Sequence, residues 1–159
     1  MILPIVTRPN PILTNPTRPV TPAELATDKI KKLIVDMTET MYAADGVGIA
    51  ANQVNVGMAI TVISKKFAGT TKDLVLVNPV WKKNTRKQTY DIEGCLSVPG
   101  VTGEVKRYTE ITVNALTAAG KPIAFIAYDY LARIVQHETD HLNGMLFVDK
   151  ARKVNNIEL

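Results

Sequence analysis

The sequence predicts an α+β fold, a single compact domain in which short antiparallel or mixed β-sheets pack around a central helix, with another helix near the N-terminus. Three observations lead to this prediction. The chain has 159 residues, a length that suits one hydrophobic core. Apolar residues recur at helical spacing in a segment near each end of the chain. Short runs rich in Val, Ile and Thr lie between these segments and no linker divides them, so we predict one domain over residues 1–159.

The first helix is predicted from Pro22 to Ala44. It begins at a capping box in Thr21–Glu24, where proline occupies the first helical position, and it ends at the glycine-containing segment Asp45–Gly48. The proline-rich segment before it, Pro4–Pro19, favours an extended arm laid over the domain. The buried face of the helix would consist of apolar residues three or four positions apart, namely Ile30, Leu33, Ile34, Met37 and Met41.

β-Strands are expected in the middle of the chain. Three short runs with high β-propensity are separated by polar residues, glycine or proline: Met58–Ile63, Leu74–Pro79 and Glu110–Leu116. A turn at Gly120–Pro122 would return the chain into a fourth run, Ile123–Ala127.

The second helix, predicted from Tyr128 to Asn143 and ended by Gly144, carries the strongest chemical signal. The two histidines of the chain, His137 and His141, lie four residues apart, so both can point from one helix face and bind one metal ion. Glu138 is turned by about 100° from His137. Its carboxylate would lie beside the metal, where a general base for a metal-activated water belongs.

Two histidines do not complete a catalytic metal site, which usually has three protein ligands and one open position. Because the chain has no further histidine, the third ligand is either a carboxylate or the single cysteine, Cys95. A lone cysteine is commonly a small buried apolar residue, but Cys95 lies in a polar, glycine-flanked segment, Glu93–Gly100. A thiolate with two imidazoles binds Fe(II), Zn(II), Co(II) or Ni(II), and ligand type alone does not choose among them.

The segment Gly46–Gln53 is a third feature with chemical meaning. It lacks the third glycine of a dinucleotide fingerprint and the Lys-Ser/Thr pair of a P-loop, and it follows a helix, so it does not indicate a nucleotide site. One interpretation is a tight turn packed on the core. The other uses the side-chain amide of Gln53, which could donate to a carbonyl oxygen that becomes negative during attack.

Composition excludes several classes of protein. One cysteine rules out an intrachain disulfide and favours a reducing compartment. No apolar run is long enough to cross a membrane, and the N-terminus has no signal-peptide pattern, so we expect a cytoplasmic protein. The net charge of +4 is compatible with a ribosome as partner, but the lysines and arginines form no tight cluster that would indicate sequence-specific binding of nucleic acid.

Together the three segments resemble peptide deformylases. That family is marked by Gly-x-Gly-x-Ala-Ala-x-Gln, Glu-Gly-Cys-x-Ser and Gln-His-Glu-x-Asp-His, matched in order by Gly46–Gln53, Glu93–Ser97 and Gln136–His141. The resemblance extends from Ile2 to about Asp149. It implies a metal hydrolase that removes the formyl group from the N-terminal methionine of new polypeptides and releases formate.

The resemblance also implies roles for individual residues. Glu138 would be the general base and later the proton donor, and Gln53 and the backbone N–H of Leu96 would hold the oxyanion. The metal ligands would be Cys95, His137 and His141. The groove for the formyl-methionyl substrate would be lined by Val47, Gly48, Glu93 and Gly94. Family members commonly use Fe(II), which is the native metal we expect, with Ni, Co or Zn as substitutes.

The match departs from the family pattern at two places. Many bacterial members carry polar or basic residues after the cysteine motif to hold the substrate backbone, whereas this chain has Gly100–Gly103, so weaker contacts or backbone contacts are expected there. The segment after Gly144 is too short for the longer C-terminal helix by which some members dock on the ribosome. That docking is therefore not expected. A compact enzyme of this kind could come from a bacterium, an organelle or a phage.

Asp140 is expected on the far side of the helix from the two histidines. We hypothesise that it pairs with Arg107 and so ties this helix to a strand; the alternative is two exposed charges.

Two other functions share part of the pattern. A HExxH metalloprotease normally takes its third ligand, His or Glu, downstream of the helix, where this chain has no histidine. The candidate ligand Cys95 lies upstream instead, which argues against a metalloprotease. A structural zinc module would need a fourth protein ligand, and it would leave Glu138 without a role.

Overall fold

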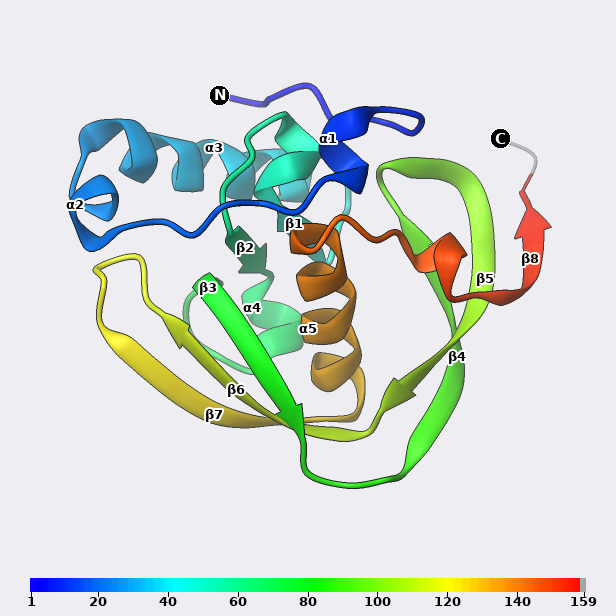
Figure 1. Cartoon of the computed structure of the whole chain (residues 1–159). Helices are drawn as coiled ribbons and strands as arrows, with labels where there is room; N and C mark the ends of the chain where they lie inside the picture. The colour runs from blue at the N-terminus through cyan, green and yellow to red at the C-terminus, as the bar shows by residue number, and fades with distance from the viewer. Residues whose placement is uncertain (158–159) are drawn as a thin grey trace.

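A computed structural model of the chain, which describes residues 1–157, consists of two antiparallel sheets arranged around a central helix (Figure 1). One sheet has five strands in the order β1-β2-β3-β6-β7, with bounds Gly48–Ala50, Ile60–Ile63, Leu74–Lys83, Glu110–Leu116 and Pro122–Tyr128. The other has three strands in the order β4-β5-β8, with bounds Gln88–Cys95, Val98–Tyr108 and Arg152–Asn156. The predicted fold class, a single α+β domain, is confirmed. The predicted domain bounds 1–159 stay a prediction, and the last two residues lie outside the described residues.

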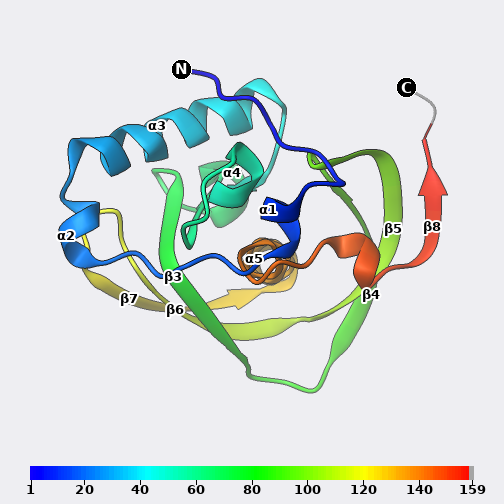
Figure 2. The same cartoon turned by 45° about the horizontal axis from the view of Figure 1, so that its top comes forward.

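Helix α5 (Asp129–Leu142) lies at the centre, and Figure 2 looks almost along its axis. In the same view helix α3 (Asp28–Ala43) lies above it, and β1 and β2 contact both helices. The remaining helical segments are short: α1 Pro11–Thr14, α2 Pro22–Leu25, α4 Lys65–Ala68 and the 3₁₀ turns Ala51–Val54 (η1) and Phe147–Asp149 (η2). Within residues 1–157, every helix is too short or too polar to span a bilayer.

Three apolar clusters hold these layers together. The first joins α3 to β1 and β2, through Met37 and Met41 against Ile49 and Ile60. The second joins α5 to the five-stranded sheet, and it includes Ile63, Leu76, Ile111, Val113, Ile134 and Val135. The third lies under the three-stranded sheet, around Leu13, Val98, Val105, Leu146 and Phe147. Helix α5 is therefore enclosed by both sheets, and its polar residues must find partners inside the protein.

The predicted first helix is wrong in one respect, because the chain forms two helices there. The capping box at Thr21 and Glu24 is present, but α2 ends at Leu25. The side chain of Thr27 then accepts a hydrogen bond from the backbone N–H of Ile30, at 3.4 Å, and starts α3. Threonine is a good N-cap, and the apolar spacing that predicted a single helix cannot register such a restart.

The predicted strands are found with small changes in their bounds. The prediction for β6 is confirmed, and β7 is one residue longer at each end than Ile123–Ala127. Strand β3 runs on to Lys83 because Asn78, with φ of 50°, forms an irregularity that lets pairing with β6 resume at Val80. Strand β2 begins at Ile60, and Met58 instead makes an isolated bridge with Arg18.

The extended N-terminal arm is also found, interrupted by α1. Its backbone N–H groups bond to two motif segments: Val6 donates to the Gln53 carbonyl at 2.7 Å and Arg8 to the Ser97 carbonyl at 3.0 Å. Further along, Thr17 donates to the Leu142 carbonyl at 2.8 Å, near the end of α5. The arm therefore connects the segments that carry all three motifs.

Gly144 follows the last turn of α5, as predicted. It has φ of +77°, in the left-handed region, and a Cβ atom added there would lie 2.6 Å from the carbonyl oxygen of Thr14. Any other residue would combine an unfavourable backbone conformation with a clash against the arm.

We expect Gly144→Ala to lower the free energy of unfolding by about 1–3 kcal/mol, because backbone strain of this kind costs that much. Urea denaturation would measure the change. Gly57→Ala is the matched control, since Gly57 has no atom within 4 Å of an added Cβ. Equal stability of the two variants would contradict the role given to Gly144.

Candidate active site

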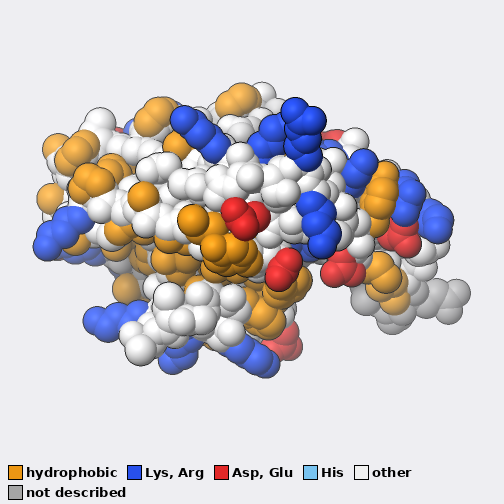
Figure 3. Space-filling model, turned by 90° about the horizontal axis from the view of Figure 1, so that it is seen from below, with side chains coloured by type: hydrophobic (Ala, Val, Ile, Leu, Met, Phe, Trp, Pro, Cys, Tyr) orange, Lys and Arg blue, Asp and Glu red, His pale blue; other side chains and the backbone are white. Residues whose placement is uncertain are grey.

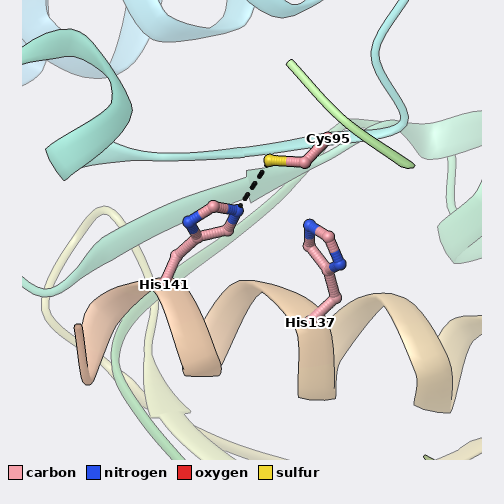
Figure 4. Close-up of side chains that lie close together, drawn as sticks. All are labelled: Cys95, His137 and His141. Carbon is pink, nitrogen blue, oxygen red and sulfur yellow. Dashed lines mark hydrogen bonds between the residues drawn. The ribbon is translucent and has the colours of Figure 1, made fainter. Parts of the chain in front are cut away.

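Three potential metal ligands come together above the C-terminal half of α5. Figure 4 shows His137 and His141 pointing from the same face of the helix toward Cys95, which lies on the segment above. The Cys95 Sγ atom is 3.1 Å from Nε2 of His141, and one ligand atom from each of the three residues lies within 4.8 Å of the others. Of the two predicted candidates for the third ligand, a carboxylate or the cysteine, the cysteine is the one that joins the histidines.

Local structure explains how Cys95 reaches this position. It is the last residue of β4, and the pairing with β5 shifts between Gly94 and Cys95. Such irregularities commonly redirect a side chain next to an active site. The two histidines need no such device, because four residues on an α-helix bring side chains back to the same face.

The donor set fits a divalent metal ion. Nδ1 of His137 lies 2.8 Å from Oε1 of Glu93, which leaves its Nε2 free to bind a metal. His141 presents Nε2 to the thiol, and its Nδ1 is buried without a hydrogen-bond partner. One sulfur and two imidazole nitrogens suit Fe(II), Zn(II), Co(II) or Ni(II), while Mg(II) and Ca(II) prefer oxygen ligands.

Glu138 is buried beside these ligands, with 3% of its surface exposed. Burial, the largest effect, raises the pKa of Glu138 to about 7, although the neighbouring His137 opposes the change. Its Oε2 atom has no hydrogen-bond partner. Its Oε1 atom would lie 2.8 Å from a Cβ added to Gly48, so the carboxylate rests against the backbone of β1. A carboxylate with these properties can accept and return a proton near neutral pH.

Gln53 is held in a single orientation, with 2% of its surface exposed. Its Oε1 accepts a hydrogen bond from the Ala50 backbone N–H at 2.9 Å. Its Nε2 therefore points the other way, toward Ser97 Oγ at 3.1 Å and Cys95 Sγ at 3.5 Å. The interpretation of Gly46–Gln53 as a tight turn packed on the core holds for its last residues, which lie in the buried 3₁₀ turn η1, while Gly48–Ala50 form the buried strand β1.

A cavity of about 380 Å³ lies over the cluster. Every residue that the sequence predicted for the site, except His141, lines it: Val47, Gly48, Gln53, Glu93, Gly94, Cys95, Leu96, His137 and Glu138. Sequence reasoning missed further lining residues, among them Ile92, Tyr130, Arg133, Ile134 and Ile157. In the view of Figure 3 the surface is hollowed between two lobes, and hydrophobic side chains gather in the hollow.

The segment that departs from the family pattern forms part of the cavity wall. Gly100 and Val101 line the cavity, and the backbone N–H of Ile157 donates to the Gly100 carbonyl at 2.6 Å. Strand β8 pairs with β5 at this point, with Asn156 opposite Val101. The wall here offers apolar side chains and backbone groups, which agrees with the expectation of few polar side-chain contacts.

Glu93 lines the cavity, but its carboxylate is turned into the protein. Oε1 accepts from Nη2 of Arg107 at 2.9 Å and lies 2.8 Å from Nδ1 of His137. Oε2 accepts from Nε of Arg107 at 3.0 Å and from Nη1 of Arg133 at 2.7 Å. Burial alone would raise the pKa of Glu93, but hydrogen bonds from His137 and Arg107 hold it well below its usual range.

The hypothesised pair between Arg107 and Asp140 is present. Nη1 of Arg107 lies 2.5 Å from Oδ2 of Asp140, and Arg107 is only 3% exposed. The alternative of two exposed charges is therefore wrong. Lys150 also bonds Asp140 at 3.1 Å. The pair belongs to a buried network that ties α5 to β4 and β5, so its loss should cost more than a surface ion pair.

Comparisons with known proteins point to one family. A family model described as polypeptide deformylase matches residues 2–156. A peptide deformylase from Aquifex aeolicus is 43% identical over 154 residues, which cover 96% of this chain and 89% of the relative. Peptide deformylase 1A, chloroplastic/mitochondrial, from Arabidopsis thaliana is 38% identical over an aligned length of 175 positions, gaps included, and the alignment covers 98% of this chain and 65% of the relative.

Solved structures agree with these sequence matches. A crystal structure of a class I type b peptide deformylase from Acinetobacter baumannii with Met-Ala-Ser bound superimposes with a TM-score of 0.88. The two sequences are 35% identical, and the match covers 94% of this chain and 99% of that chain.

Arg107→Ala is expected to lower the free energy of unfolding by about 3–5 kcal/mol, because it leaves two carboxylates buried without their main partner. Chemical denaturation would measure the loss. In Arg152→Ala, which removes an exposed pair with Glu104, the change should be at most about 1 kcal/mol. A comparable small loss in both variants would contradict the buried network.

Proposed function

This chain belongs to the polypeptide deformylase family and removes the formyl group from N-terminal formylmethionine; we propose that hydrolysis takes place between Glu138 and the cluster of Cys95, His137 and His141. The single observation that supports this proposal is the position of Glu138. Its buried carboxylate, with a pKa raised to about 7, lies beside three convergent metal ligands on the wall of one cavity.

Cys95, His137 and His141 would hold one divalent ion. When bound, such an ion lowers the pKa of water and polarises a carbonyl oxygen. We propose Fe(II) as the native ion, because the donor set accepts it and the resemblance to the family implies it. Metal analysis of protein purified without oxygen would test this choice against Zn, Ni and Co.

Glu138 is proposed to carry the protons. It would take a proton from the attacking water and later give it to the amine nitrogen of the departing peptide, so that formate and a free N-terminus are released. A group with a pKa near the working pH does both steps well. The unpartnered Oε2 atom of Glu138 is free to face the water or the amine.

Gln53 and Leu96 are proposed to stabilise the negative oxygen of the tetrahedral intermediate. The fixed orientation of Gln53 leaves its amide N–H groups directed toward the Cys95 side of the cavity. Leu96 follows Cys95 directly and lines the same cavity, where its backbone N–H could donate. Donors that are held in place before reaction are the effective kind.

The substrate is a peptide that begins with formylmethionine. We propose that Val47, Gly48, Glu93 and Gly94 form the groove for its first residues, since all four line the cavity. For Glu93 the groove contact would come from the residue's backbone, because its carboxylate is bonded to Arg107, Arg133 and His137. Beyond the methionine, the apolar wall at Val101 and Ile157 would contact the following side chains.

Ribosome contact and cellular location are two further questions about this chain. Between Gly144 and residue 157 the described residues form η2 and β8. We propose the bacterial cytoplasm or an organelle as the location, because relatives come from bacteria and from plant organelles. The metalloprotease that shares the HExxH pattern is set aside, since the matched family is a deformylase family.

Formate release from a formyl-Met tripeptide, by protein loaded with Fe(II) or Ni(II) without oxygen, would test the proposed roles. Glu138→Ala should lower turnover by about 10²–10⁴-fold, the usual worth of a general base, while metal content stays unchanged. Gln53→Ala should lower turnover by about 10²–10³-fold. No formate from the metal-loaded, folded wild type would contradict the function, and an active Glu138→Ala variant would contradict only the role of that residue.

Gly48→Ala should act through Glu138. An added Cβ would come within 2.8 Å of the carboxylate and displace it, and a displacement of about 1 Å can cost about 10²-fold in rate. The fold and the metal content should be retained. Gly57→Ala, which has space around it, should keep full turnover. Unchanged turnover in Gly48→Ala would show that the position of Glu138 against β1 does not matter.

A further inference from the structure

Arg133 is a buried charged residue to which neither the family resemblance nor the proposed reaction gives a role. It lies on α5 one turn before His137 and two turns before His141, so all three side chains share one helix face. Only 5% of its surface is exposed, and it lines the wall of the active-site cavity. A guanidinium buried so deeply needs a partner for its charge and for its donors.

The guanidinium makes three hydrogen bonds, all to the β4–β5 hairpin that carries Cys95. Nη1 donates to Oε2 of Glu93 and to the Val105 carbonyl, both at 2.7 Å. Nη2 donates to the Thr89 carbonyl at 2.8 Å. One side chain of α5 is therefore attached to both strands of the hairpin, and the planar geometry of the group fixes the direction of each bond.

Glu93, the shared partner, has no acceptor position left. A carboxylate has about four lone-pair positions on two oxygens. At Glu93 two belong to Arg107, one to Arg133 and one to Nδ1 of His137. Because each oxygen is held by an arginine, the carboxylate cannot turn away from His137 without breaking a charged hydrogen bond inside the protein.

We infer that Arg133 is a positioning residue of the metal centre: it fixes the carboxylate of Glu93, and through it the ring of His137, relative to Cys95. With Nδ1 of His137 held by Glu93, the Nε2 atom is the one that remains for the metal. The bonds to Val105 and Thr89 set the spacing between the helix that carries two ligands and the hairpin that carries the third. This inference rests on the proposed metal centre.

If Arg133 had only a structural role, its removal would give a different set of measurements. It would hold the hairpin against α5, and its removal would lower stability without changing a metal ion bound by the folded protein. A positioning residue changes the bound metal itself. Co(II) distinguishes these cases, because its visible absorption depends on the geometry of its ligands and its loss to a chelator can be timed.

The experiment compares Arg133→Met, which removes the guanidinium, with Arg133→Lys, which keeps a positive charge. Arg152→Met is the matched control, since Arg152 is half exposed and pairs with Glu104. Each full-length protein is loaded with Co(II), and its spectrum, its rate of Co(II) loss to a chelator and its melting temperature are measured. We expect Arg133→Met to lose Co(II) about 10–100-fold faster with a changed spectrum, as for other groups that orient metal ligands, and Arg133→Lys to fall in between.

A wild-type spectrum and wild-type Co(II) loss in folded Arg133→Met would overturn the inference, even if the melting temperature fell. If Arg133→Met does not fold, Arg133→Lys is compared in the wild-type and Glu93→Gln backgrounds. Because the effect should pass through Glu93, it should largely vanish in the second background, and an equal effect in both would overturn the inference. None of these measurements uses formate, so a protein that holds Co(II) but lacks deformylase activity would contradict the proposed function alone.

Discussion

Helix α5 is buried between two sheets although most of its central residues are polar or charged. Arg133, Gln136, Glu138, Thr139, Asp140 and His141 are all buried. Each polar group therefore needs a partner on a surrounding element. Gln136 bonds both backbone groups of Tyr108 at the end of β5, Trp81 of β3 donates to Thr139, and Arg107 of β5 pairs with Asp140. The hydrogen bonds that the buried polar groups of α5 require thus fix the positions of β3, β4 and β5 around this helix.

Burying this many charges is costly, and apolar residues of the same size would in general give an equally stable protein. What the charges provide is a defined geometry. Glu93 is held between two arginines on one side and His137 on the other, so the orientation of a metal ligand is set before any metal arrives. Glu138 has one oxygen without a partner, which leaves that oxygen available for chemistry.

Much of this could be predicted from the sequence, for reasons specific to each element. The four-residue spacing of His137 and His141 fixes their geometry on any helix. Because the sequence has no third histidine, the third metal ligand had to be a carboxylate or Cys95. The strands around the site were harder. Strand β4 contains Gln, Asp, Glu and Gly and is mostly exposed at its start, so it lacks the apolar pattern that marked β6. Arg133 was missed because one arginine in an amphipathic helix gives no sign of whether it faces solvent or a buried carboxylate. The one available signal was its position four residues before His137, which places both side chains on the same helix face.

The N-terminal arm gives the molecule a particular order of assembly. Its early residues bond to Gln53 and Ser97, and Thr17 bonds to Leu142, so the arm has all of these partners only after α5 has been synthesised. During synthesis the arm, α3 and the first strands emerge long before α5, which supplies two of the three metal ligands and the contact surface for both sheets. Contacts between such distant residues form late and slow the folding of a chain. A nascent chain halted before α5 would therefore leave the apolar face of the five-stranded sheet uncovered and would lack two of the three metal ligands, so the core and the metal centre both depend on the same helix.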